Sequence, residues 1–155
     1  MPMTAPTPPD AAELYEGIVR QTTEALIFAD CDGLIRLWSS GAEALFGFSA
    51  AEALGRSLDL IIPERLRAAH WAGFNRAIAA GRTQHGGQIR TPRAGHRDGD
   101  KRYVDMSFGL VIGRDGSVLG SIAMARDASA KRALEEALRG CRDELARPGG
   151  AAADR

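Results

Sequence analysis

Residues 33–49 read GLIRLWSSGAEALFGFS and change from a strand pattern to a helical pattern. The apolar run Leu34–Trp38 follows another short apolar run, Ala25–Asp30, across an Asp-Gly pair. Two such runs around Asp-Gly predict a β-hairpin, because this pair readily adopts the positive φ angles of tight turns. The segment 40–43 (SGAE) has the spacing of a capping box and predicts a short helix that ends near Gly47. The stretch therefore indicates a hairpin that leads directly into helices.

Helical signals continue for some forty residues and then give way to strands. Ser49–Glu52 repeats the helix-start pattern, and Pro63 opens a longer helix for which Gly81 is the stop signal. Three strand patterns follow, at Gln88–Pro92, Arg102–Gly113 and Val118–Ala125. In the second of these, polar and apolar residues alternate from Tyr103 to Phe108, which suits an antiparallel sheet with one buried face. The order of elements predicts an α+β fold, an antiparallel sheet whose helices gather on one side.

A helix is predicted on each side of this core. The first occupies residues 10–24 and places Leu14 and Ile18 on one apolar stripe. The second occupies residues 128–147 after Asp127 and carries a stripe at heptad spacing, made of Leu134, Leu138, Cys141 and Leu145. The core is then 25–127, and the ends, 1–9 and 148–155, are predicted to be disordered because they are rich in proline, glycine or polar residues.

Length and composition favour one ordinary globular domain. The chain has 155 residues, with 20 basic and 20 acidic side chains, so no basic face is indicated and we expect no nucleic-acid binding. The N-terminus lacks the pattern of a signal peptide, and no apolar run is long enough to span a membrane. Cys31 and Cys141 lie far apart and form neither a disulfide framework nor a metal motif. We therefore expect a cytoplasmic protein without a membrane partner.

The sequence offers no catalytic constellation. A nucleophile, a base and an orienting group would need serine or cysteine beside histidine and a carboxylate. The chain has three histidines, His70, His85 and His96, and contains no GxSxG, P-loop or HExxH motif. We therefore expect a binding module and not an enzyme.

Several motifs, taken together, resemble those of bacterial PAS domains. They occur in the family's order and spacing over roughly residues 12–128, at 33–49, 52–56, 60–64, 96–99 and 120–127. The resemblance implies a five-stranded antiparallel sheet of strand order 2-1-5-4-3 with a ligand pocket under the helices. It also implies a signalling helix that leaves the domain after Asp127.

One part of the chain is similar to a particular branch of this family. Residues 63–70 (PERLRAAH) resemble the helix that carries the proximal histidine in oxygen-sensing haem PAS domains of the FixL type. This similarity implies that His70 is the axial ligand of haem iron, that Arg76 lies near a propionate and that Arg90 hydrogen-bonds bound dioxygen. The distal side of the pocket would be lined by Met106 and Phe108.

Other interpretations of these residues remain open. A histidine at the position of His70 also occurs in PAS domains without haem, Arg90 could pair with a carboxylate, and Met106 could be core filler. The pocket would then bind another small apolar or aromatic ligand, or nothing. Flavin photochemistry of the blue-light branch is not expected, since neither Cys31 nor Cys141 matches the position of its reactive cysteine.

The function predicted from the sequence is that of a PAS sensor or interaction module in signal transduction. The alternatives are a haem-based gas or redox sensor and a ligand-free dimerisation module. We expect a homodimer whose contacts are made by Leu14, Ile18, Leu134, Leu138, Cys141 and Leu145. The C-terminal stripe could instead pack back on the domain's own sheet. The initiating methionine and the polar tail favour a complete protein, whose output would be a separate histidine kinase or regulator.

Overall fold

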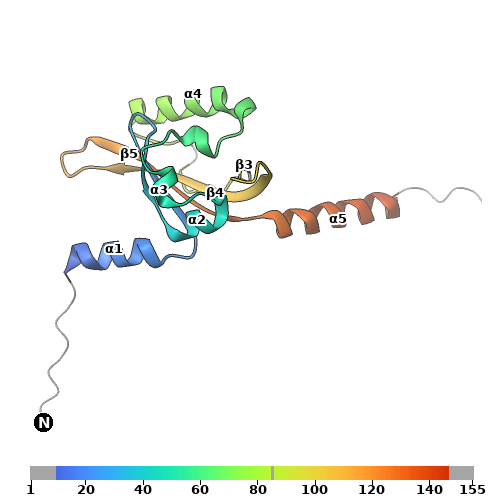
Figure 1. Cartoon of the computed structure of the whole chain (residues 1–155). Helices are drawn as coiled ribbons and strands as arrows, with labels where there is room; N and C mark the ends of the chain where they lie inside the picture. The colour runs from blue at the N-terminus through green and yellow to red at the C-terminus, as the bar shows by residue number, and fades with distance from the viewer. Residues whose placement is uncertain (1–9, 85, 147–155) are drawn as a thin grey trace, which may run out of the picture.

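The computed structural model describes residues 10–84 and 86–146 (Figure 1). In chain order the elements are α1 (Ala11–Gln21), β1 (Ala25–Asp30), β2 (Ile35–Trp38), α2 (Ser40–Phe46), α3 (Ala50–Ala53), the 3₁₀ turn η1 (Leu58–Leu60), α4 (Glu64–Ala80), β3 (Arg93–Gly95), β4 (Lys101–Ile112), β5 (Val118–Asp127) and α5 (Ser129–Ala146). The terminal segments 1–9 and 148–155, predicted to be disordered, lie outside the described residues.

The five strands form one antiparallel sheet of order β2-β1-β5-β4-β3. This confirms the predicted fold class and strand order. Figure 1 shows α2, α3 and α4 beside the sheet, whereas α1 and α5 project away from it on opposite sides. The core therefore lies between the sheet and the three helices, and two helices leave it.

The first hairpin is built by its Asp-Gly turn, as predicted. The carboxylate of Asp30 accepts hydrogen bonds from the backbone N–H groups of Asp32 (3.1 Å) and Leu34 (2.9 Å). Gly33 has φ 76°, and a Cβ on it would lie 2.3 Å from the Trp71 ring of α4. Glycine is required there both by the backbone conformation and by the close approach of a side chain.

A buried serine joins the first helix of the core to the sheet. Ser39, which is 2% exposed, accepts hydrogen bonds from the N–H groups of Leu26 in β1 (2.8 Å) and Ala42 in α2 (3.2 Å). It is therefore the N-cap of α2, one residue before the predicted capping segment. Ser40 instead donates its hydroxyl to the carbonyl of Arg20 at 2.8 Å. The largest fully buried side chains around this junction and across the sheet are Phe46, Ile27, Ile35 and Val104.

The strand predicted at Gln88–Pro92 is wrong, because β3 is Arg93–Gly95. Arg90 still exchanges two backbone hydrogen bonds with Met106 of β4, with N···O distances of 2.9 and 2.7 Å. Pro92 accepts a bond from the N–H of Val104 (3.1 Å), but proline has no N–H to return. The ladder is therefore interrupted at Pro92, and only the residues after it form a regular strand.

Candidate functional site

His70 lies on α4 among aromatic side chains. Its ring meets Trp71 edge-on, with 5.1 Å between ring centroids, and stacks on Phe74 at 6.0 Å. Its Nδ1 is buried and has no hydrogen-bond partner among the described residues. Burial lowers the pKa of His70, although the charge of Asp59 acts in the opposite direction. The imidazole is therefore held in its neutral form, which is the form that binds metals.

The position of α4 is fixed by contacts with the turn before it. Trp71 donates its indole N–H to the carboxylate of Asp59 in η1 (2.9 Å), and Arg67 donates to the Asp59 backbone carbonyl (3.1 Å). Phe74 is buried in the core on the same helix. These contacts orient the side of α4 on which the His70 ring lies.

The other residues predicted around a haem are distributed between core and surface. Met106 is 6% exposed and faces the core from β4, while Phe108, two residues further on the same face, is 37% exposed. The structure brings Arg90 next to Met106 through their paired backbones. The side chains of Arg76 and Arg90 are both exposed. His70 and Met106 thus lie at the core, whereas both arginines lie on the surface.

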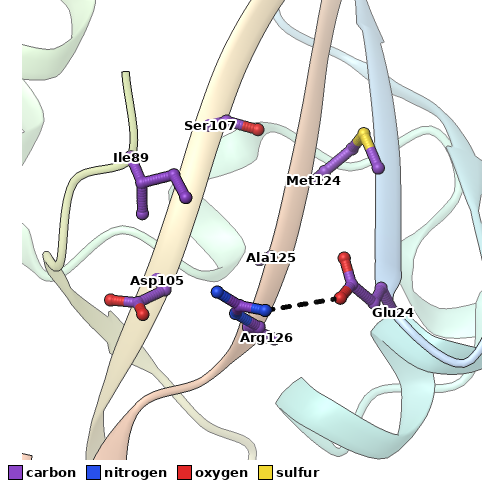
Figure 2. A pocket seen from close by; sticks show the side chains of 7 residues that line it. All are labelled: Glu24, Ile89, Asp105, Ser107, Met124, Ala125 and Arg126. Carbon is purple, nitrogen blue, oxygen red and sulfur yellow. Dashed lines mark ion pairs between the residues drawn. The ribbon is translucent and has the colours of Figure 1, made fainter. Parts of the chain in front are cut away.

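A small depression lies on the opposite face of the sheet, away from the helices. Its volume is about 130 Å³. Figure 2 shows it between the start of β1, the strands β4 and β5 and the loop before β3, lined by Glu24, Ile89, Asp105, Ser107, Met124, Ala125 and Arg126. Arg126 extends toward Glu24 in this view, with 4.0 Å between Nη1 and Oε1. Sequence reasoning identified none of these residues as a site, although the alternation along β4 placed Asp105 and Ser107 on one face.

Asp105 is the buried charge of this depression. Its side chain is 5% exposed and accepts hydrogen bonds from the Thr91 hydroxyl (2.6 Å) and the Lys131 ammonium (3.0 Å). The hydrogen bond from Thr91, followed by that from Lys131, lowers the pKa of Asp105. Because Lys131 belongs to the first turns of α5, this carboxylate connects the sheet to the C-terminal helix.

Tyr103, two residues earlier on β4, makes a second connection. Its carbonyl accepts a hydrogen bond from the N–H of Ala128 at 2.9 Å. The guanidinium groups of Arg93 and Arg132 lie 4.9 and 5.2 Å from its ring centroid. Arg93 also donates to the Tyr103 hydroxyl (2.7 Å), and this hydrogen bond lowers the pKa of the phenol. The first turns of α5 therefore touch the same strand at two places.

The residues predicted to make a dimer are exposed in this chain. Leu14 and Ile18 of α1 are 46% and 58% exposed, and neither α1 nor α5 has a buried side chain. On α5 the exposed fractions are 63% for Leu134, 58% for Leu138 and 86% for Leu145. Cys141, on the same stripe, is a free exposed thiol. The stripe of α5 does not pack back on the domain's own sheet.

Two kinds of feature are absent from the part of the chain that the structure describes. Within residues 10–84 and 86–146, no three or more histidine, cysteine or acidic side chains gather as a metal would require. Over the same residues, no helix combines the length and the apolar character needed to cross a bilayer.

Comparisons with known proteins agree on one family. A sequence model described as the PAS fold matches residues 13–128. The sensor protein FixL of Bradyrhizobium diazoefficiens is 32% identical over 92 residues, which cover 59% of this chain and 18% of that protein. The oxygen sensor protein DosP of Escherichia coli is 29% identical over 134 residues, covering 84% of this chain and 16% of that protein. The chain thus spans less than a fifth of either relative.

Solved structures show the same fold at low sequence identity. A PAS domain from Colwellia psychrerythraea has a TM-score of 0.68 and 19% identity, and the match covers 78% of this chain and 99% of that one. A sensory box histidine kinase/response regulator from Burkholderia thailandensis has a TM-score of 0.60 and 18% identity, covering 86% of this chain and 98% of the solved chain.

Proposed function

This chain belongs to the PAS family of sensor domains in signalling, and from this premise we propose that it transmits a binding event through a dimerising C-terminal helix. The event is the binding of a small ligand or cofactor between α4 and the sheet. PAS domains are generally sensory and not catalytic, and we propose no reaction. A separate kinase or regulator would receive the signal.

The observation that carries this proposal is the exposed stripe of α5. Leu134, Leu138 and Leu145 are largely exposed to water, at a spacing that places them along one side of the helix. A heptad stripe is typical of a seam that a second helix covers. A second copy of the chain would supply an identical stripe. In addition, α5 follows directly from β5, which is a central strand of the sheet. Movements of the sheet would therefore reach the dimer contact.

The native cysteine on this stripe allows a direct test. In a parallel dimer in register, the two Cys141 thiols face each other, so mild oxidation of a Cys31→Ser chain should give a covalent dimer on a non-reducing gel. Leu138→Glu should reduce this product strongly, because it places like charges in the seam. Arg139→Glu, one residue away on α5, is the matched control and should retain it. A chain that sediments as a monomer and gives no covalent dimer would contradict the proposal.

A second candidate, a haem-based gas or redox sensor, is favoured by the surroundings of His70. Its Nδ1 is buried without a partner in the described structure and its pKa is lowered, so the residue fits the role of a ligand that would hold haem iron. His70 would hold the iron, Arg76 would lie near a propionate, and Arg90 would hydrogen-bond a bound gas. The far side of the group would be lined by Met106 and Phe108. When bound, haem would supply an iron centre that takes up a diatomic gas. One relative, DosP, is named as an oxygen sensor.

An absorption spectrum of the chain purified with haem supplied tests this candidate. We expect a strong Soret band that is lost or displaced in His70→Ala and retained in His96→Ala, whose ring lies beside Gly47 at the end of α2 and contacts Asp98. Further changes on adding dioxygen or carbon monoxide would identify the signal. A missing band, or one that does not respond to His70→Ala, would exclude haem and leave another small ligand or an empty pocket.

A further inference from the structure

The first turns of α5 are attached to the sheet through a buried carboxylate. One oxygen of Asp105 accepts the Lys131 ammonium at 3.0 Å, and the other accepts the Thr91 hydroxyl at 2.6 Å. The Asp105 side chain is 5% exposed and that of Lys131 is 57% exposed. A carboxylate removed from water needs such partners, because an unpaired buried charge is costly. Asp105 therefore draws the base of α5 onto the outer face of the sheet.

The same strand connects this contact to the core. Side chains alternate between the two faces of a strand, so Val104 and Met106, on either side of Asp105, point into the core. Thr91, the second partner of Asp105, follows Arg90, whose backbone is paired with Met106. A shift of β4 caused by a molecule in the core would therefore move both the carboxylate and the hydroxyl that orients it.

Lys131 also lies in line with the apolar stripe of α5, one heptad before its second leucine. It lies seven residues before Leu138, which in turn lies seven before Leu145, so these three occupy equivalent heptad positions. A lysine at such a position weakens a two-helix seam. In this structure the ammonium is held by Asp105 instead, and the apolar part of the stripe begins at Leu134.

We propose that the Asp105–Lys131 pair is a switchable joint that sets how α5 leaves the sheet and where its contact with a second helix begins. When the pair is closed, the first turns of α5 are held against β4 and the helix contact starts at Leu134. When β4 moves and the pair opens, Lys131 enters the seam and α5 reorients. The inference deepens the proposed function and rests on the signalling role of α5.

Hydrogen exchange in the full-length chain tests the joint without any ligand. Lys131→Met removes the ammonium and keeps most of the side-chain volume, and should accelerate exchange of the backbone amides at 128–136 by roughly tenfold. Exchange in β1 and β5 should stay at its original rate. Lys101→Met is the matched control, since Lys101 is the chain's other lysine and forms no ion pair within the described residues. An unchanged rate at 128–136 in Lys131→Met would overturn the joint.

Thr91 tests whether the carboxylate transmits the effect. Among the described residues no hydrogen bond joins Thr91 to α5, since its hydroxyl donates to Asp105. Thr91→Val should nevertheless accelerate exchange at 128–136, because the Asp105 carboxylate is then free to turn away from Lys131. In a Lys131→Met background the same substitution should have no further effect. Equal effects of Thr91→Val in both backgrounds would show independent destabilisation and would contradict the joint.

Oxidation at Cys141 in the same variants separates this inference from the function on which it rests. If the Cys31→Ser chain forms the covalent dimer and Lys131→Met leaves exchange unchanged, the joint is wrong and the signalling helix stands. If no dimer forms but the exchange results are as expected, the attachment of α5 stands, while its switching of a helix seam and the dimer proposal both fall.

Discussion

At the scale of single residues, Asp105 makes the stability of the protein depend on pH. Its hydrogen bonds to Thr91 and Lys131 lower the pKa of the carboxyl below its ordinary value of 3.8. A carboxyl whose pKa is lower in the folded state binds fewer protons there than in the unfolded state. It therefore stabilises the fold above about pH 4, and this contribution is lost as the pH falls through the folded pKa.

Asp105→Asn should accordingly flatten the acid branch of the stability curve. The free energy of unfolding, measured by urea denaturation at a series of pH values from 6 downward, should fall less steeply below about pH 4 in the variant than in the native chain. Thr91→Val should flatten it partly, since it removes the largest single cause of the lowered pKa of Asp105. Parallel curves for all three proteins would show that Asp105 does not carry this dependence.

Sequence reasoning could place Asp105 on a face of a strand but could not find its partners. The alternation along 103–108 made Asp105 one of the polar residues facing away from the core. Thr91 and Lys131 lie 14 and 26 residues away along the chain. A polar position in a strand pattern is ordinarily solvated, and its burial here depends on the segment before β3 and on α5. Contacts of this kind exist only once the fold is assembled.

At the scale of elements, Gly120 leaves room for the close approach of the central strand β5 to β1. A Cβ added there would lie 2.1 Å from the carbonyl oxygen of Ala29 in β1, which is backbone and cannot rotate away. Gly120→Ala should therefore force β1 and β5 apart and lower the free energy of unfolding by about 3 kcal/mol. Chemical denaturation measures this loss.

Gly73→Ala is the matched control for this substitution. Gly73 lies in the middle of α4, and a Cβ added there meets nothing within 4 Å. The change should raise the free energy of unfolding by about 0.5–1 kcal/mol, because alanine loses less backbone entropy than glycine in a helix. Opposite signs are expected for the two variants, and a loss of similar size in both would contradict the argument from Cβ contacts.

The elements that sequence reasoning located well are those with strong local signals. Asp-Gly marks the first hairpin, and Pro63 and Gly81 mark the two ends of α4, where Gly81 adopts a positive φ of 62°. The strand at 88–92 was misplaced because its apolar and polar residues fit a strand pattern, while Pro92 interrupts the ladder. A strand pattern depends on the side chains alone, whereas a strand in a sheet also needs a hydrogen-bond partner for each backbone N–H group.

At the scale of the whole molecule, the strand order followed from family resemblance, whereas the two flanking helices were predicted from their own residue patterns. Long-range pairing, such as that of β1 with β5 across most of the chain, has no local signal. For the same reason the sequence identified these four residues as a candidate haem site but could not show that His70 and Met106 lie at the core while the side chains of Arg76 and Arg90 are exposed. Which residues share a face could be predicted, but which side chains meet could not.

The register of the two central strands also determines where the two flanking helices leave the domain. Ala25, the first residue of β1, is paired with Ala125, close to the end of β5, so the polypeptide enters and leaves the sheet side by side. In Figure 1, α1 and α5 run outward from this place while the core lies to one side of them. The domain is thus attached to the side of the path formed by α1, the paired ends of β1 and β5, and α5. It adds little to the length of this path, and a force applied along the two helices would pass beside the core, through the short stretch in which the two strands pair.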